Sequence, residues 1–412
     1  MKEDGATGRW GDKATFHLRP VAPSFSQKQM LTLIENGFVY APEPRGVQSV
    51  LFAGDRIEKI GGVDRRALEA AGLDLEVIDA GGCLVTPGLV DPHEHLLGGS
   101  GEEGFSSQTP EIFLREIATA GVTTVVGCLG VDTTTKTMPG LLARAKALGE
   151  EGLTAFIWSG GYNVPPTTIT GSLRDDLIFI DEVIGAGEIA ISDNRAAEPT
   201  LDELARLVSE VYVGGTLSRK SGVTHFHVGD HPRRLSPLRA LIENYAVEPE
   251  WLYPTHVDRS RELMREAAAF TRLGAFVDVD VTEENLPEQL RRFIEDNGDL
   301  SRLTVSSDAA ISSPRALHDQ MRACVVEHGF PLEMVLSLGA SNTARVLKLG
   351  RKGRLERGCD ADALVLRHKS LEITHVFARG RQLVRGGELV VTERFLTRSK
   401  RRISLYGREP HG

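Results

Sequence analysis

The sequence predicts an α/β fold: a (β/α)8 TIM barrel with a small composite β-sandwich domain built from both ends of the chain. The middle, from about residue 85 to 349, alternates short apolar segments with longer helical patterns. Period-two patterning, typical of strands, occurs at both ends, from about 31 to 84 and from about 363 to 391. Terminal strands without a core of their own can pair with each other, which leaves the middle to form the barrel.

The apolar segments of the middle match the eight strands of such a barrel. They span 84–89, 123–127, 155–158, 188–191, 223–227, 252–255, 275–278 and 303–306. Helical patterns between them span 111–119, 137–150, 201–214, 235–245, 259–273 and 287–296. A doubly wound open sheet is the alternative, but neither GxGxxG nor GxxxxGKS/T opens a helix here. The repetition therefore favours the barrel, whose active sites lie at the C-terminal ends of the strands.

The predicted organisation has four parts. They are an N-terminal extension (1–30), the composite β domain (31–86 and 356–396), the barrel (87–355) and a C-terminal tail (397–412). The extension is polar and lacks both the apolar core of a signal peptide and the length of a membrane span. We therefore expect no membrane association.

The net charge and the cysteine content of the chain indicate which binding partners and which cellular compartment to expect. The chain has 48 Lys+Arg against 57 Asp+Glu, a net charge of −9, which argues against a nucleic-acid or anionic-membrane surface. Its four cysteines show no CxxC spacing, and no secretory segment precedes them. A disulfide framework is therefore not expected, and we predict a reducing, cytoplasmic location.

Two histidines two residues apart end the first barrel segment. His93 and His95 close the run PGLVDPHEH, and side chains at i and i+2 of a strand project to the same face. They can therefore offer two imidazoles to one metal ion at the barrel mouth. For this short motif alone, a pair of surface loop histidines is an equal alternative.

Three further strand ends carry residue types that ligate metals. His227 ends VTHFH, His256 ends LYPTH, and Asp308 ends LTVSSD. One strand-end histidine is more often an ordinary core or surface residue. Five candidate ligands in the order HxH, His, His, Asp, all at predicted strand ends, indicate a metal centre instead.

These motifs resemble the amidohydrolase superfamily, and within it the isoaspartyl (β-aspartyl) dipeptidase family, over about residues 31–390. HEHLLGGSGE (93–102) resembles the family's HxH followed by a Gly-rich loop and a glutamate, and GGYNVP (160–165) resembles its tyrosine loop. The motifs AISDNR, FHVGD, PTHVDR and SSD follow in the same order. The resemblance implies hydrolysis of the β-aspartyl amide bond of dipeptides by a metal-bridged hydroxide, with two divalent ions, zinc by resemblance, in a homo-oligomer.

One ligand position departs from that family. Its members carry a carboxylated lysine that bridges two metals, and the residue here is Glu188. The glutamate offers the same two-oxygen carboxylate on a stem about three atoms shorter, so the backbone would have to move inward. We predict that Glu188 bridges the two ions without carbon dioxide. An exposed acidic residue beside a one-metal site is the alternative.

The resemblance also assigns roles around the metals. His93, His95 and Asp308 would hold one ion, His227 and His256 the other. Asp308 would act as the general base and acid, and Tyr162 would donate to the developing oxyanion. The substrate-binding residues by resemblance are Ser100, Glu102, Arg195, Arg259 and Ser312. Glu102 would bind the substrate ammonium, and the two arginines would bind its carboxylates. The alternative for each of the three is an ordinary solvated surface residue.

Other functions stay open at this point. A dihydroorotase-like or hydantoinase-like cyclic amide hydrolase would use the same metals without the Glu102 loop. An N-acyl amino acid deacylase would replace the paired charges with an apolar acyl pocket. A non-catalytic scaffold is disfavoured because none of the His or Asp ligands is missing.

Overall fold

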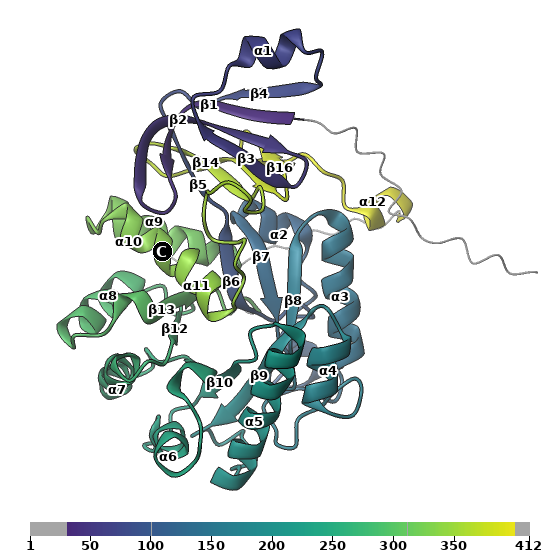
Figure 1. Cartoon of the computed structure of the whole chain (residues 1–412). Coiled ribbons are helices and arrows are strands. Elements are labelled where there is room, and N and C mark those ends of the chain that lie inside the picture. The colour runs from purple at the N-terminus through teal and green to yellow at the C-terminus, as the bar shows by residue number, and fades with distance from the viewer. Residues whose placement is uncertain (1–30, 100, 311, 400–412) are drawn as a thin grey trace, which may run out of the picture.

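The computed structural model describes residues 31–99, 101–310 and 312–399. The predicted N-terminal extension, Ser100 and most of the predicted C-terminal tail lie outside these residues. Two parts stack on each other: a β domain at the top of Figure 1, and a larger strand and helix layer below it. None of the helices in the described ranges is long and apolar enough to cross a membrane.

The lower part is the predicted barrel. Its strands, in chain order, are β6 (Leu89–Glu94), β7 (Val122–Gly127), β8 (Thr154–Ser159), β9 (Val183–Ile191), β10 (Thr224–Val228), β11 (Leu252–Thr255), β12 (Val277–Asp280) and β13 (Leu303–Ser306). Strands β6 to β11 form one parallel sheet in sequence order, and β12 pairs with β13 in parallel. Val257 N donates to Asp278 O (3.4 Å) between β11 and β12, and His95 N donates to Ala309 O (2.9 Å) between β13 and β6. These contacts complete the ring of eight strands.

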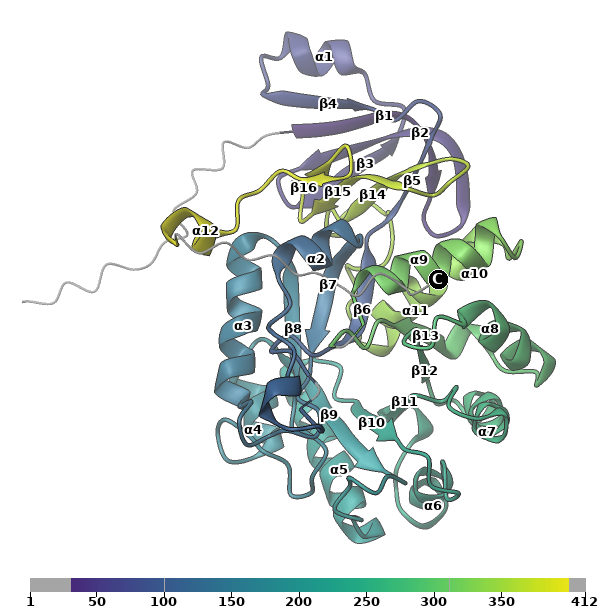
Figure 2. The same cartoon turned by 180° about the vertical axis from the view of Figure 1, so that it is seen from behind.

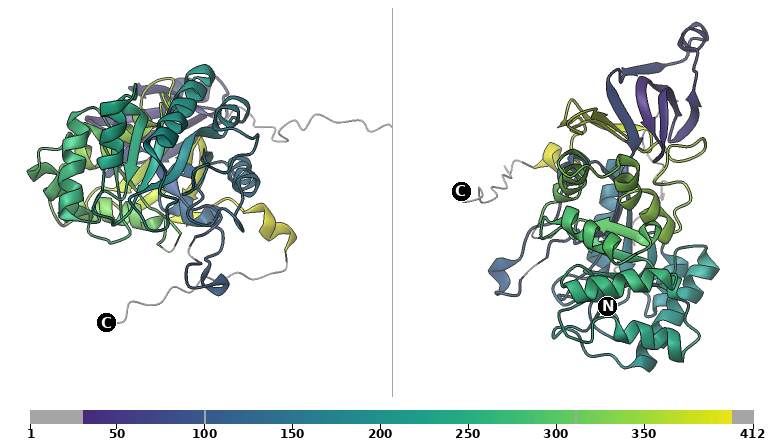
Figure 3. Two further views of the ribbon diagram at one scale, coloured as in Figure 1. Left: turned by 90° about the horizontal axis from the view of Figure 1, so that it is seen from below. Right: turned by 90° about the vertical axis from the view of Figure 1, so that its left-hand side faces the viewer.

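Helices pack around the ring of strands (Figures 1 and 2). They are α2 (Leu114–Thr119), α3 (Met138–Glu151), α4 (Leu173–Phe179), α5 (Leu201–Ser218), α6 (Ser236–Asn244), α7 (Arg261–Arg272), α8 (Leu286–Glu295), α9 (Arg315–Val326), α10 (Leu332–Leu338) and α11 (Ser341–Val346). Six of the ten lie within a few residues of the helical patterns predicted from the sequence; α4 and α9 to α11 were not predicted. Viewed from below, these helices surround the strands (left panel of Figure 3).

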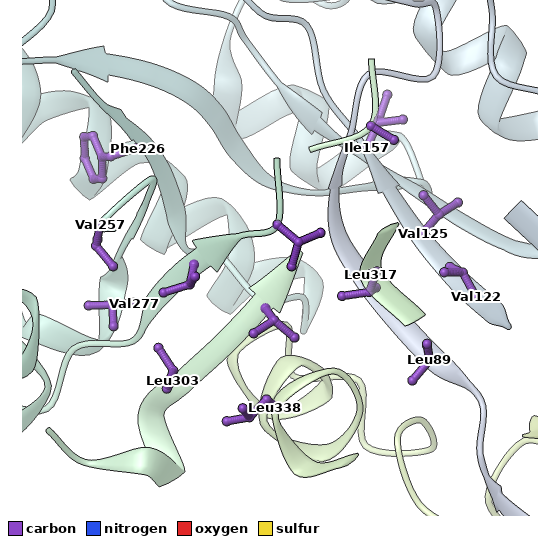
Figure 4. Close-up of a cluster of buried hydrophobic side chains, with 14 of the residues drawn as sticks. Leu89, Val122, Val125, Ile157, Phe226, Val257, Val277, Leu303, Leu317 and Leu338 are labelled. Carbon is purple, nitrogen blue, oxygen red and sulfur yellow. The ribbon is translucent and has the colours of Figure 1, made fainter. Parts of the chain in front are cut away.

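Two apolar clusters fill the two faces of the barrel strands. Val125, Ile157 and Phe226 face outward, in a cluster that includes Leu317 of α9 and Leu338 of α10 (Figure 4). Burial of each such side chain contributes about 1.5–3 kcal/mol. The neighbouring positions, such as Val126 and Trp158, belong to a separate cluster inside the ring, so that the barrel is packed beneath the strand ends.

The β domain draws its strands from both ends of the chain, as the sequence predicts. It holds β1 (Leu31–Tyr40), β2 (Pro44–Ala53), β3 (Arg56–Gly61), β4 (Leu75–Asp79) and β5 (Cys83–Pro87), and β14 (Ala363–Arg367), β15 (Ile373–Ala378), β16 (Arg381–Arg385) and β17 (Glu388–Leu389). The order is β17-β16-β15-β14-β5-β1-β2-β3, with β4 also on β1. Phe52 and Phe377, from opposite ends of the chain, stack edge to face with ring centroids 5.6 Å apart. Helix α1 (Arg65–Ala70) joins β3 to β4, and α12 (Arg394–Arg398) follows β17.

The first predicted barrel strand, 84–89, is wrong in its boundaries. The segment divides into β5, which pairs with β14 in the β domain, and β6, which begins the barrel at Leu89. Gly88 lies at the division because a Cβ there would meet Oγ1 of Thr123 at 2.3 Å. One continuous apolar run therefore serves two domains, and its hydrophobicity alone gives no sign of the break.

Candidate active site

The predicted metal-ligating side chains come from five barrel strands and meet at one end of the ring. His93 lies in β6, Glu188 in β9 and His227 in β10, while His95, His256 and Asp308 come just after β6, β11 and β13. His93 and Glu188 are completely buried, and the Asp308 side chain is 20% exposed. The convergence that the strand-end pattern predicts is therefore present in the fold.

One group of ligand atoms surrounds a common point. His93 Nε2 lies 3.4 Å from Glu188 Oε2 and 3.3 Å from Asp308 Oδ1, and His95 Nε2 lies 3.2 Å from Asp308 Oδ1. Two ligand atoms bound tetrahedrally to one ion at about 2.1 Å lie about 3.4 Å apart. His93 Nε2 and Glu188 Oε2 are buried and have no hydrogen-bond partner among the described residues. The spacing and the unpartnered atoms both fit a divalent ion.

A second group shares Glu188 with the first. Glu188 Oε1 lies 2.6 Å from His227 Nδ1 and 3.0 Å from His256 Nε2, and these three residues form a separate possible metal group. The two oxygens of one carboxylate thus face two different sets of ligands. Because Glu188 is buried between them, the alternative of an exposed acidic residue is wrong.

The backbone of β9 moves Glu188 into this position. Across the pairing of β9 with β10, Thr224 is opposite Ala186 and Phe226 is opposite Ile189, so β9 carries one extra residue here. Gly187 lies in this bulge, and a Cβ at Gly187 would meet His225 Cβ at 2.7 Å. The bulge and the glycine let β9 approach β10 closely enough for the shorter side chain of Glu188 to reach both groups.

Further buried side chains, to which the sequence patterns assigned no role, orient the histidines. His256 Nδ1 donates to Asp280 (2.7 Å), His227 Nε2 lies 3.0 Å from Asp193 Oδ2, and His93 Nδ1 lies 3.3 Å from His225 Nε2. Such partners fix the tautomer and ring orientation of a ligating histidine. The sequence did contain signals, because His225 and His227 repeat the HxH spacing and Asp280 ends its strand.

Electrostatics keep the acids of the site ionised. Burial raises the pKa of the Glu188 carboxyl, but its electrostatic interaction with His93 and His227 and its hydrogen bonds with His227 and His256 outweigh burial and hold that pKa well below its usual range. Burial also raises the pKa of Asp308, but its interaction with His93 and its hydrogen bond with His95 outweigh burial and lower that pKa. Both carboxylates are therefore available as anionic ligands at neutral pH.

The other predicted residues line a cavity of about 680 Å³ above these groups. The Tyr162 hydroxyl lies 2.8 Å from His227 Nδ1, and burial raises the pKa of this tyrosine well above its usual value. Ser312 Oγ donates to the Ser307 carbonyl (3.1 Å). The cavity also contains Arg259, whose Nη1 is 3.7 Å from the exposed Asp230. Ser100 is the one predicted site residue outside the described ranges.

Two oppositely charged side chains meet across this cavity. Arg195 Nη1 lies 2.8 Å from Glu102 Oε1, and Arg195 Nη2 lies 2.8 Å from Asp193 Oδ2. The Glu102 side chain is 54% exposed, so it is free to exchange its partner for a ligand group. The hydrogen bonds that Arg195 donates to the Asp193 carboxylate raise the pKa of Arg195, which is a permanent cation here. Of the predicted substrate-binding residues, the cavity therefore presents one anion, Glu102, and two cations, Arg195 and Arg259, next to the buried ligand groups.

The family model of the amidohydrolase family matches residues 84–383. The chain belongs to this family, and the fold and the ordered strand-end ligands agree with the match. Members typically bind divalent metal ions, in keeping with the His, Asp and Glu groups described above. The chain is thus a hydrolase of the amidohydrolase class.

Within that class, the chain is similar to a β-aspartyl dipeptidase. The enzyme of this name from Fervidobacterium islandicum AW-1 is 39% identical, superposes with a TM-score of 0.84, and matches over 87% of this chain and 98% of its own. A second structure of that enzyme, in complex with the dipeptide β-Asp-Leu, gives a TM-score of 0.82. A D-hydantoinase from Thermus sp. shares the fold at 16% identity and a TM-score of 0.61, over 88% of this chain and 97% of its own.

Curated relatives carry other names and match over shorter stretches. An imidazolonepropionase from Bradyrhizobium sp. is 34% identical over 34% of this chain and 32% of its own. Adenine deaminase 2 from Rhizobium meliloti is 25% identical over 76% of this chain and 51% of its own. The chain therefore spans a third to a half of the length of these two relatives, so they support the family and not a particular substrate.

Proposed function

We propose that this protein hydrolyses the β-aspartyl amide bond of dipeptides with the help of two divalent metal ions. The observation that carries the proposal is the meeting of two ligand groups, which share Glu188, with the paired charges of Glu102 and Arg195 in one cavity. The similarity to an enzyme whose structure holds β-Asp-Leu supports the same substrate class.

His93, His95 and Asp308 would hold one ion, His227 and His256 the other, and Glu188 both. The chemistry that a pair of divalent ions supplies when bound is Lewis-acid activation of water and of the scissile carbonyl. We propose zinc for both ions, because zinc commonly binds imidazole nitrogens and carboxylate oxygens. We also propose that the protein forms a homo-oligomer, that it is cytoplasmic, and that its domains have the boundaries predicted from the sequence.

Asp308 would transfer a proton from the attacking water to the leaving amine. Its Oδ1 faces the first ligand group, 3.2 Å from His95 Nε2, and the neighbouring histidines keep the carboxylate ionised. An ionised carboxylate in this place can accept a proton from the attacking water and pass it to the leaving amine. The partial exposure of the Asp308 side chain, 20%, leaves it in contact with the cavity.

Tyr162 would stabilise the oxyanion that forms at the scissile carbonyl. Because burial raises its pKa well above the usual value, its hydroxyl keeps its proton and remains a donor. The hydroxyl lies beside His227, at the rim of the second ligand group. A donor that is already held in place loses little entropy when the negative charge develops.

The charged groups of the cavity match those of the substrate. A β-aspartyl dipeptide carries a free α-ammonium and two carboxylates. Glu102 can pair with the ammonium, and Arg195 and Arg259 can each bind a carboxylate through forked hydrogen bonds. In the free protein Glu102 and Arg195 satisfy each other, so the substrate replaces an existing ion pair and no charge is left unpaired.

A substrate panel tests this proposal against its alternatives. We expect turnover of β-Asp-Leu, little turnover of α-Asp-Leu, whose scissile carbonyl lies one carbon away, and a collapse of kcat/KM when the α-amine of β-Asp-Leu is acetylated. Glu102→Gln should reduce kcat/KM for β-Asp-Leu. Preference for N-acyl amino acids with a silent Glu102→Gln would establish the deacylase, and preference for dihydroorotate or hydantoins would establish the cyclic amide hydrolase.

A further inference from the structure

A buried carboxylate outside the ligand groups contacts the loop that carries Tyr162. Strand β8 ends at Ser159 and helix α4 begins at Leu173, so residues 160–172 connect them and are called the tyrosine loop below. Asp176 lies in the first turn of α4 and is completely buried. A buried carboxylate is costly unless hydrogen bonds or charges compensate it, so its partners identify what it holds in place.

The partners of Asp176 lie at both ends of the tyrosine loop. Its Oδ2 accepts from Ser159 Oγ at 2.5 Å and from Ile169 N at 3.0 Å. Its Oδ1 accepts from the backbone N and the Oγ1 of Thr170, at 2.8 and 2.7 Å. Hydrogen bonds to an ionised acceptor are roughly twice as strong as those between neutral groups. One carboxylate therefore joins the point where the loop leaves β8 to the stretch that leads into α4.

The rest of the loop has few other hydrogen bonds to hold it. Tyr162 N donates to Gly130 O (3.4 Å), and Tyr162 O accepts from Ala190 N (3.1 Å). In the described part of the chain, no backbone–backbone hydrogen bond reaches residues 163–171. The side-chain hydrogen bonds that tie this stretch to an element outside the loop all go to Asp176. The path of the loop after Tyr162 thus depends on this one acceptor.

We propose that Asp176 is a positioning residue that holds the hydroxyl of Tyr162 at the second ligand group, 2.8 Å from His227 Nδ1. By fixing both ends of the tyrosine loop, it keeps the donor where the oxyanion would form. Asp176 is not among the residues that line the cavity, so it acts through Tyr162 and not on the substrate. The inference rests on the role of Tyr162 in the proposed function.

Steady-state kinetics with β-Asp-Leu on the metal-loaded protein test the inference. Asp176→Asn keeps the size of the side chain but replaces one acceptor oxygen by an NH₂ group, which cannot accept from the loop. We expect kcat to fall by about 10–10²-fold with little change in KM. Asp362→Asn is the matched control and should keep the wild-type kcat. Asp362 is also buried, but it bonds Lys352 Nζ (2.6 Å) and Arg379 N (2.7 Å) away from the cavity.

A double variant separates positioning from a general loss of structure. Tyr162→Phe alone should lower kcat by about 10²–10³-fold, the range for losing one oxyanion donor. Adding Asp176→Asn to Tyr162→Phe should cause no further loss, because the hydroxyl that Asp176 positions is already absent. A further loss as large as that in Asp176→Asn alone would overturn the inference, since Asp176 would then act on something other than Tyr162.

Amide hydrogen exchange gives a second measurement that does not depend on turnover. Exchange across residues 160–172, followed by mass spectrometry, should be faster in Asp176→Asn and unchanged in Asp362→Asn. Unchanged exchange in Asp176→Asn would overturn the inference and leave the proposed function intact. A silent Tyr162→Phe would instead overturn the oxyanion role in the proposed function, and faster exchange in Asp176→Asn would then still confirm that Asp176 holds the loop.

A milder variant covers the case in which Asp176→Asn does not fold. Thr170→Val removes one of the donors to Asp176 at an exposed position. We expect a smaller fall in kcat and faster exchange over the tyrosine loop, with no effect on kcat in the Tyr162→Phe background. Wild-type exchange and kcat in Thr170→Val would overturn the inference.

Discussion

Nδ1 of His93 lies 3.3 Å from Nε2 of His225 in the barrel interior. His225 Nδ1 is 3.0 Å from the Tyr253 carbonyl, which can only accept, so this nitrogen carries the His225 proton. His225 Nε2 is then an acceptor, and His93 donates to it from Nδ1. The lone pair of His93 Nε2 is left facing the ligand group, as a metal ligand requires.

Replacing His225 should weaken metal binding without removing a ligand. His225→Phe keeps a ring to stack on Trp158, whose ring centroid is 5.1 Å away, but it removes the acceptor for His93. We expect zinc affinity to fall by about 10–100-fold, measured by competition with a chromogenic chelator. His318→Phe is the control, because His318 is buried and bonds the Leu371 carbonyl outside the site. An unchanged zinc affinity in His225→Phe would refute the role of His225 in orienting His93.

The site should assemble without carbon dioxide. Glu188 supplies its own carboxylate, so metal content and activity should be the same in bicarbonate-free and bicarbonate-containing buffer, as measured by elemental analysis and turnover. Glu188→Gln should lose metal, because an amide offers one neutral oxygen where two charged ones are needed. Metal content that rises with bicarbonate, or a full complement in Glu188→Gln, would show that another group bridges.

Asp308 should matter more for turnover than for metal binding. Asp308→Asn keeps an oxygen near His93 and His95 but cannot accept a proton. We expect kcat to fall by about 10²-fold or more while a good part of the metal remains. Steady-state kinetics and metal analysis on the same sample separate the two effects. Near wild-type kcat would assign the proton transfer to another residue.

Arg259 should contribute through a substrate carboxylate. Arg259→Met keeps most of the side-chain length and removes the charge, so a carboxylate in a closed site loses its partner. We expect a cost of about 2–4 kcal/mol in kcat/KM for β-Asp-Leu. Arg367→Met is the control, because Arg367 is an exposed arginine of β14 that pairs with Glu372 (3.1 Å) in the β domain. Equal kinetics for the two variants would remove Arg259 from substrate binding.

Part of the site could be predicted from the sequence, because the C-terminal ends of all the strands of a barrel lie close together at one rim. His93, His227 and His256 are far apart in the chain, yet each ends a short apolar run, and parallel strands bring such ends to one rim. The joining of strands from both ends of the chain into one β domain follows similarly from the strand patterns at those ends. These features depend on periodicity, which is a local property of the sequence.

Other features depend on contacts that no local pattern encodes. The bulge that lets Glu188 face two ligand groups arises from the approach of β9 to β10. The ion pair of Glu102 and Arg195 joins a loop after β6 to a loop after β9.

Metal removal and return tests the central claim most directly. The chelated protein should not hydrolyse β-Asp-Leu, and zinc added back in steps should restore turnover until about two ions are bound per chain. The two-ion end point follows from the two ligand groups that share Glu188. Full hydrolysis of β-Asp-Leu by the metal-free protein would contradict the account.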